Sequence, residues 1–190
     1  MTDYSRDFRR RVAFQGERGA FSEEAALKLL GPDVELVPTR TFQDLFAAIS
    51  NGSADLVLAP VHNTIAGDVR ETVDVLHAGF LIVLDEIAIR IKQHLIALRG
   101  IDFDAISTAQ SHPVALAQCA EFFSQHPEIQ LVKADDTAGS VAEIVKNNDR
   151  HRAAVAGRRA AEIYGGNILR ENIQDRTDNY TRFVLLSRNH

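Results

Sequence analysis

Several residue types are scarce in this chain, and each scarcity excludes a class of protein. It has no Trp, one Met and one Cys among 190 residues, so Cys119 has neither an intrachain disulfide partner nor a second thiolate for a metal site. We therefore expect a reducing compartment. Five Pro and 11 Gly are too few for a fibrous chain, and 45% hydrophobic residues are too many for a disordered one. The sequence predicts a globular protein that folds without disulfides.

Long apolar runs are also missing. The longest, such as residues 80–84, fall far short of the ~20 residues that span a membrane. Residues 1–11 are charged and lack the apolar region of a secretory signal, and the arginines at 9–11 resemble a solvated leader. A net charge of −5 gives no overall attraction to nucleic acid. We expect a cytoplasmic protein with no nucleic-acid or membrane partner.

Short apolar runs alternate along the chain with segments of helical periodicity, which is typical of α/β proteins. Strands are predicted at 12–14, 34–37, 55–59, 131–132, 153–156 and 181–186, and residues 81–98 are predicted to form one long strand. Helices are predicted from Ser22, from caps at Thr41, Ser111 and Thr137, and before Gly165-Gly166.

This order predicts two lobes, linked by two crossing strands, with the ligand between them. Residues 1–85 and 168–190 are expected to form the first lobe, and residues 86–167 the second.

Three polar segments occupy positions from which they can reach such a cleft. The N–H groups of residues 16–22, between a strand and a helix, can bind an anion, although an ordinary turn gives the same pattern. Residues 60–67 follow a buried strand, where polar side chains are hard to explain as core unless they form a simple Asn-containing loop. Ser111 and Gln118 lie two turns apart on one predicted helix, unless Ser111 is only its N-cap.

A fourth segment, residues 179–183, opens the last strand. Alternation places Thr181 and Phe183 on one face and Arg182 on the other, where an arginine is either an anion ligand or a surface residue. Metal and covalent catalysis are disfavoured, because the seven His lack metal-ligand spacing and no Gly-x-Ser-x-Gly elbow occurs. Cys119 is expected to be a buried, inert thiol.

Taken in order, the four segments resemble the catalytic domain of prephenate dehydratase over about residues 12–187. They read Val12-Ala13-Phe14-Gln15-Gly16 with Gly19-Ala20-Phe21-Ser22; residues 60–67; Ser111-His112-Pro113-Val114-Ala115-Leu116 with Gln118-Cys119; and Ile173-Gln174-Asp175 followed by Asn179-Tyr180-Thr181-Arg182-Phe183. The resemblance implies a fold like that of type II periplasmic binding proteins. It also implies conversion of prephenate to phenylpyruvate in phenylalanine biosynthesis, with loss of water and carbon dioxide, no cofactor or metal, and a homodimer.

The same resemblance implies the functional residues. The catalytic set is Thr181, Arg182, Phe183 and His62, and the substrate-binding set is Asn63, Thr64, Ser111, Gln118, Ala20, Phe21 and Ser22. Thr181 would assist departure of the 4-hydroxyl group. Because an aliphatic hydroxyl is a very weak acid, we expect it to donate a hydrogen bond or relay a proton.

Two features depart from the family pattern. His62 stands where the family usually has glutamate, which changes the charge, whereas Thr64 in place of serine keeps the hydroxyl. The sequence also ends at His190 without the family's regulatory ACT domain, so feedback inhibition by a domain in the same chain is not expected.

Arogenate is a further candidate substrate, and two other functions stay open. A non-aromatising prephenate decarboxylase would not need Thr181, and a non-catalytic protein that binds small carboxylates would not need residues 181–183.

Overall fold

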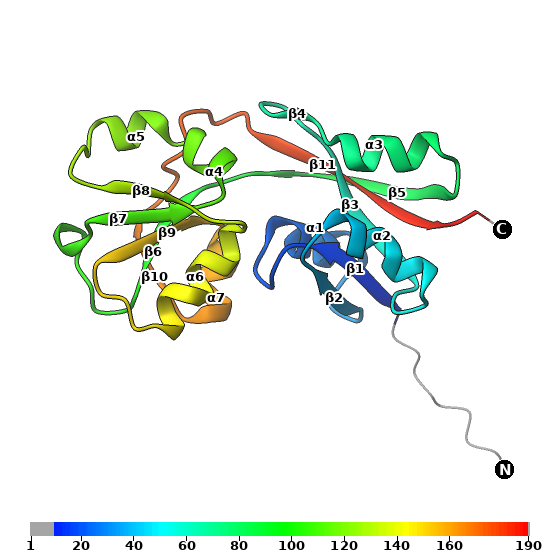
Figure 1. The fold of residues 1–190 in the computed structure, drawn as a ribbon, viewed down its shortest axis with the longest axis horizontal. Helices are drawn as coiled ribbons and strands as arrows, with labels where there is room; N and C mark the ends of the chain where they lie inside the picture. Colours follow the sequence, from blue (N-terminus) through cyan, green and yellow to red (C-terminus); the bar gives the residue numbers. More distant parts are fainter. Residues whose placement is uncertain (1–9, 190) are drawn as a thin grey trace, which may run out of the picture.

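The computed structural model describes residues 10–189; residues 1–9, which include most of the expected leader, and His190 lie outside the described part. Two β-sheets, each with its own helices, lie side by side (Figure 1). The predicted two-lobe α/β architecture is confirmed.

The first lobe is built on a sheet with the strand order β2-β1-β3-β11-β5, to which β4 adds on β3. β1, β2 and β3 are parallel, whereas β11 is antiparallel to both β3 and β5. Its strands are β1 (Arg11–Gln15), β2 (Glu35–Thr39), β3 (Leu56–Asn63), β4 (Gly67–Asp68), β5 (Leu81–Arg90) and β11 (Tyr180–Arg188). Its helices are α1 (Phe21–Leu30), α2 (Phe42–Ser50) and α3 (Arg70–His77).

The second lobe is built on a sheet with the strand order β10-β6-β9-β7-β8. Its strands are β6 (His94–Ala97), β7 (Thr108–Ser111), β8 (Gln130–Lys133), β9 (Arg152–Ala156) and β10 (Asn167–Arg170). Its helices are α4 (Pro113–Ala117), α5 (Ala120–Ser124), α6 (Thr137–Lys146) and α7 (Arg158–Tyr164), with a 3-10 turn, η1 (Phe103–Ala105).

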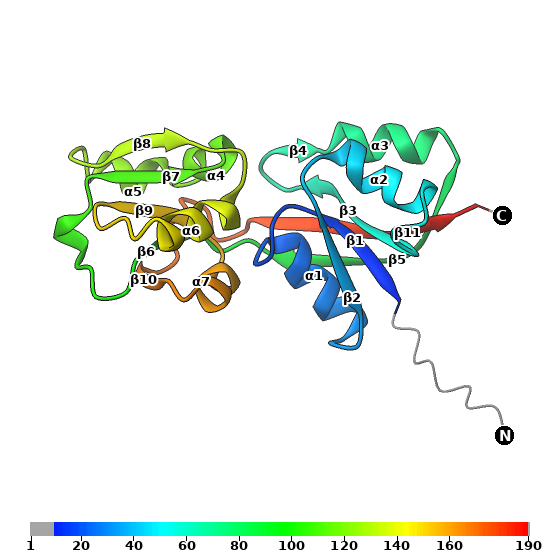
Figure 2. The same ribbon diagram turned by 60° about the horizontal axis from the view of Figure 1, so that its bottom comes forward.

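The chain crosses between the lobes at residues 91–93 and 171–179 (Figure 2), and backbone hydrogen bonds join the two crossings. Ile91 N donates to Asn179 O (2.8 Å) and Ile173 N donates to Gln93 O (2.9 Å). The single strand predicted over 81–98 is therefore wrong: β5 and β6 belong to different sheets. The lobe limits drawn at 85/86 and 167/168 fall inside β5 and β10, because each strand stays with its sheet to its end.

Two apolar clusters cover the faces of the first sheet. Val184 and Leu186 of β11 pack toward α2 and α3, and Phe183 and Leu185 pack with Ala25 of α1. β11 is thus buried along most of its length, although only its first residues, within the segment 179–183, were predicted to carry function.

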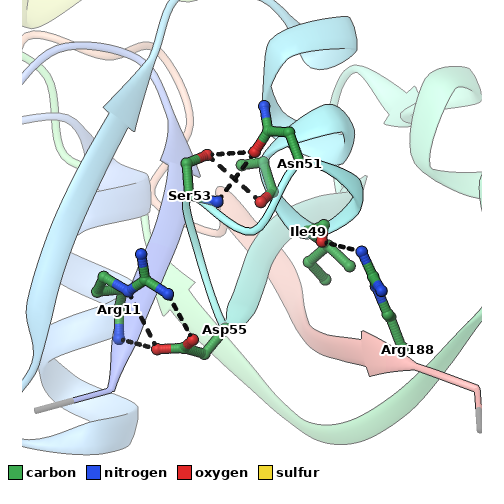
Figure 3. A network of polar contacts seen from close by, with 7 residues as sticks. Arg11, Ile49, Asn51, Ser53, Asp55 and Arg188 are labelled. Carbon is green, nitrogen blue, oxygen red and sulfur yellow. Dashed lines mark hydrogen bonds and ion pairs between the residues drawn. The ribbon is translucent and has the colours of Figure 1, made fainter. Parts of the chain in front are cut away.

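At the start of β1 and the end of β11, polar contacts hold the strand ends in place (Figure 3). Arg11, placed in the leader by sequence reasoning, instead begins β1 and forms an ion pair with Asp55 at 2.8 Å. The guanidinium hydrogen bond lowers the pKa of the Asp55 carboxyl below its ordinary value. Arg188 at the end of β11 donates to the Ile49 carbonyl of α2 (2.6 Å). No helix in the described part of the chain has the length and apolarity needed to cross a membrane.

The lobes also contact each other directly. Phe14 and Ala20 of the first lobe share an apolar cluster with Ile96 and Ala160 of the second. Gly19 has φ +88°, and a Cβ there would lie 2.8 Å from the Ala160 Cα, so only glycine permits this approach. These contacts fix how closely the two lobes approach each other here.

Candidate functional site

A pocket of about 590 Å³ lies between the lobes. On the first lobe it is lined by the start of α1 and the segment that enters α3; on the second it is lined by the starts of α4 and α6. The lining includes Ala20, Phe21, Ser22, Arg70, His112 and Val114.

The start of α1 presents backbone N–H groups to this pocket. α1 begins at Phe21 with Ala20 at the N-cap, and no side chain caps it within residues 10–189. Ser22, the predicted first residue, lies one position inside the helix and is buried. An uncapped N-terminus of a ten-residue helix carries partial positive charge and can bind a carboxylate. Ala20, Phe21 and Ser22 are thus gathered at one wall of the cleft.

A second pocket of about 330 Å³ adjoins the first through their shared residue Val114. Its lining is mostly apolar, from Ile65, Ala66, Val114 and Ala117, and its polar groups are Gln118, Asp175 and Arg176. Both lobes and the second crossing therefore contribute to this pair of neighbouring pockets, which together form the candidate cleft.

Behind this second pocket, buried side chains form a polar network across β3 and β11. Asn63 and Thr181 are direct partners in the β3–β11 register, and Asn63 Nδ2 donates to Thr181 Oγ1 at 2.9 Å. Asn63 Nδ2 also donates to Asn179 Oδ1 at 2.8 Å, and Asn179 Nδ2 donates to Gln118 Oε1 at 3.0 Å. The structure therefore brings together Asn63, Gln118 and Thr181, three of the predicted site residues.

Thr64 closes the same turn from outside. Its hydroxyl donates to the Asp178 carbonyl (3.0 Å) and accepts from Tyr180 N (3.0 Å). A serine hydroxyl could form both hydrogen bonds, so the threonine keeps this part of the family pattern. Thr64 anchors the segment before Thr181 and is itself exposed.

Ser111 was predicted to bind substrate or, alternatively, to cap a helix, and its hydroxyl is instead bound within the protein. It is the last residue of β7, fully buried, and its hydroxyl donates to the Val155 carbonyl at 2.6 Å. His112 is the N-cap instead, because its Nδ1 accepts from Val114 N at 3.2 Å. α4 has only five residues, so Gln118 follows the helix at its C-cap instead of lying two turns along it. Asp136, not Thr137, caps α6, because the Asp136 side chain accepts from Gly139 N.

Arg182, Phe183 and His62 lie apart from the Asn63–Thr181 pair. Phe183 is 2% exposed in the core beneath α1. Arg182 is exposed, with its guanidinium 3.4 Å from Glu86. His62 precedes Asn63 on β3, so its side chain points to the opposite face, where Nδ1 lies 2.7 Å from Asp68 Oδ1.

Several residues in or beside the cleft were missed by sequence reasoning. Glu23 is 1% exposed near the start of α1, where it accepts from Gly19 N (2.7 Å) and from Arg159 Nε of the second lobe (2.8 Å). Arg70 lines the larger pocket together with the acidic residues Asp68, Glu71, Asp135 and Asp136. Arg176 lines the smaller pocket and is paired with Asp178 at 2.7 Å. No local pattern marks these residues, because each acquires its surroundings from segments far away in sequence.

Cys119 is buried as expected. Burial, reinforced by the negative charge of Asp175, raises the pKa of its thiol far above the ordinary value. It therefore holds its proton at neutral pH and is not an activated nucleophile.

Comparison with known proteins decides the family. A family model described as prephenate dehydratase matches residues 12–190. The chain belongs to the prephenate dehydratase family. It is 38% identical to an arogenate dehydratase/prephenate dehydratase of Arabidopsis thaliana over 180 residues, which is 94% of this chain and 46% of that protein. The chain thus spans less than half the length of this curated relative.

Solved structures support the same assignment. The chain superposes on prephenate dehydratase from Arthrobacter aurescens, determined with L-Phe, with a TM-score of 0.86 and 28% identity, covering 95% of this chain and 61% of that one. It also superposes on GqqA, described as a quorum quenching acylase, with a TM-score of 0.84 and 31% identity, covering 95% of this chain and 65% of that one. Members with this fold therefore carry more than one described activity.

Proposed function

We propose that this protein is a prephenate dehydratase acting in phenylalanine biosynthesis. The observation that carries the proposal is the hydrogen bond from Asn63 to Thr181 in a chain matched by the family over residues 12–190. Asn63 donates to the Thr181 oxygen, and no hydrogen bond among residues 10–189 uses the proton of that hydroxyl. Thr181 therefore keeps a proton for a leaving group.

The reaction needs little from the protein beyond placement and charge. The bond from the ring to its carboxylate breaks, and its electron pair enters the ring as carbon dioxide leaves. The bond to the 4-hydroxyl breaks with its electron pair, and that oxygen takes up one proton to leave as water. Aromatisation supplies the driving force, so preorganised hydrogen bonds and exclusion of water are the contribution of the enzyme.

The two pockets contain groups that can hold the substrate, and acidic side chains also line the larger one. The uncapped start of α1 and Arg70 can hold the side-chain carboxylate of prephenate in the larger pocket. Apolar side chains line the smaller pocket, from Ile65, Ala66 and Val114, and they would favour loss of the ring carboxylate as neutral carbon dioxide once bound substrate displaces water from them. Gln118 and Arg176 are the side-chain donors that line that pocket.

The predicted roles of other residues divide accordingly. We propose that Asn63 holds Thr181, and that Thr64 and Ser111 fix the backbone around the site. Phe183 supports β11 from the core. Arg182 and His62 lie on the opposite face of the sheet, so we propose that they do not touch the substrate and influence the site only through their charge. Arogenate differs from prephenate only in its side chain, and the Arabidopsis relative is named for both substrates.

Product analysis with purified protein tests the proposal. We expect prephenate to yield phenylpyruvate, followed by its ultraviolet spectrum, and arogenate is assayed in parallel for phenylalanine. A non-aromatic dihydro product would instead support the decarboxylase, and binding without turnover would support a carboxylate-binding protein. Either of these results overturns the dehydratase.

An acylase is the second candidate, favoured by the likeness to GqqA. Acyl transfer to a side chain needs an activated nucleophile. The Cys119 thiol stays protonated, and the Ser111 hydroxyl donates to a buried carbonyl instead of facing a base. Hydrolysis of an N-acyl substrate by this chain, without turnover of prephenate or arogenate, would establish the acylase.

We also propose that the protein is a cytoplasmic homodimer. In this dimer β5 pairs edge to edge with β5 of a second copy. β5 is an edge strand, and residues beside its free edge are exposed and apolar: Phe80 (78%), Ile82, Val83 and Leu84. An edge strand can pair with its own copy about a twofold axis, which satisfies its backbone groups and buries these side chains.

Light scattering during size-exclusion chromatography tests this interface. We expect a mass of twice 21.0 kDa for the unmodified chain and of 21.0 kDa for the double variant Phe80→Glu/Val83→Glu. Leu131→Glu, at an exposed apolar position of the second lobe, serves as the matched control and should not change the mass. A monomeric unmodified chain, or a dimeric double variant, contradicts the interface.

A further inference from the structure

Asn179 occupies the junction between the second crossing and β11, and nothing in the reaction itself calls for it. It is fully buried and hydrogen-bonded to both lobes, to Asn63 of β3 and to Gln118 after α4. We propose that Asn179 is a positioning residue that determines which end of the Gln118 side-chain amide faces the substrate. This inference rests on the proposed function, because it concerns how the same cleft binds its ligand.

The orientation of the first amide in the network is fixed by the backbone. The Asn63 side-chain oxygen accepts from Ile65 N (3.0 Å) and Ala66 N (2.8 Å), and a backbone N–H can only donate. The other end of this amide must therefore be the NH2 group. That group faces Asn179 Oδ1, Thr181 Oγ1 and the Tyr180 carbonyl (3.1 Å), which all accept from it.

The orientation is then passed on. Since Asn179 Oδ1 accepts from Asn63, the remaining end of the Asn179 amide is its NH2 group, which donates to Gln118 Oε1 at 3.0 Å. Gln118 consequently turns its oxygen inward and keeps its own NH2 group for the smaller pocket, which it lines. Two backbone N–H groups thus decide the polarity of an amide in the other lobe.

Burial makes this polarity difficult to reverse. Asn179 is 0% exposed and Asn63 is 9% exposed, so water cannot readily replace a lost partner at either amide. Turning either amide around would place oxygen against oxygen, or NH2 against NH2, and leave buried groups unsatisfied. The network therefore presents donors at both of its ends, the Gln118 NH2 group and the Thr181 hydroxyl.

Donors are what a dicarboxylate substrate requires. An NH2 group directed into the pocket can donate to a carboxylate, whereas an amide oxygen in the same place would repel it. Because Gln118 and Thr181 receive their polarity through separate branches from Asn63, a change at Asn179 can alter one without the other.

Asn179→Asp separates the two branches. Aspartate has the same shape but only acceptors when ionised, so it still accepts from Asn63 while Gln118 must turn its NH2 group inward. We expect KM for prephenate to rise about 10- to 100-fold, as for loss of a hydrogen bond to a charged group, with kcat within about 3-fold. In a Gln118→Met background the same substitution should add less than about 3-fold.

Gln118→Glu tests the same point without touching the buried residue. Its carboxylate can accept from Asn179 but presents oxygen to the pocket, so the rise in KM should match that of Asn179→Asp. Should Asn179→Asp fold poorly, this variant decides. An unchanged KM in Gln118→Glu, or a loss confined to kcat in Asn179→Asp, overturns the inference.

A measurement on the protein without substrate keeps this inference distinct from the proposed function. The side-chain amide protons of Gln118, followed by NMR, should exchange with solvent quickly in the unmodified chain and at least 10-fold more slowly in Asn179→Asp, roughly the protection of one hydrogen bond. If they do so while neither prephenate nor arogenate is turned over, the proposed function fails and the amide polarity stands. Equal exchange rates in the two proteins would contradict the proposed orientation of the Gln118 amide, even if the enzyme is active.

Discussion

Thr181→Ala is expected to lower kcat for prephenate by at least ~100-fold, the lower end of what a positioned proton donor supplies. The hydroxyl accepts from Asn63 Nδ2 and, within residues 10–189, its proton has no other use. Removal of the hydroxyl leaves the 4-hydroxyl of the substrate to depart without a donor. KM should change far less, because the carboxylates are held by other groups.

Two variants separate chemistry from packing at this position. Thr181→Ser keeps the hydroxyl and should retain most of kcat, whereas Thr181→Val keeps the shape and should lose as much as Ala. Each should fold, as judged by circular dichroism, since Thr181 packs at the margin of the core with 9% of its surface exposed. A Val variant with near-normal kcat would remove Thr181 from the reaction.

Much of the architecture could be predicted from local patterns. Strand β1 and its neighbours follow short apolar runs, and the cap of α2 is as predicted, since Thr41 Oγ1 accepts from Asp44 N at 3.0 Å. Such features depend on residues only a few positions apart, so the sequence itself displays them. The two-lobe arrangement followed from the alternation of these elements.

The sequence-based predictions were wrong where contacts between distant segments determine the structure. Alternation over 81–98 cannot reveal that β5 pairs with β11 and β6 with β9, because both halves have the same local geometry. Ser111 has the residue type and position of a cap, yet Val155, 44 residues away, takes its hydroxyl. Asn179 belongs to the segment 179–183 that the sequence singled out, but its contact with Asn63, 116 residues away, has no local signal.

Phe183→Ala is expected to lower the free energy of unfolding by about 3–5 kcal/mol, because it removes a large aromatic side chain from a packed core. Phe183 is 2% exposed and packs with Ala25, Ala26 and Leu58 between α1 and the sheet. The loss is a large fraction of the roughly 5–15 kcal/mol that stabilises a typical domain. Urea unfolding followed by circular dichroism measures it.

The neighbouring positions provide the comparison that gives this result its meaning. Phe183→Leu fills most of the same space and should cost clearly less than Ala, while Arg182→Gln, at an exposed residue with a single 3.4 Å contact to Glu86, should change stability by at most about 1 kcal/mol. For the folded fraction of Phe183→Ala we expect kcat within about 10-fold of normal, because the side chain supports β11 from beneath α1 instead of touching the substrate. A Phe183→Ala protein that unfolds at the normal urea concentration but has lost kcat would place this ring against the substrate. The ring of residue 183 would then take part in the reaction. The division proposed above, with 181 as a hydrogen-bond donor, 182 as a surface residue and 183 as a core residue, would be wrong.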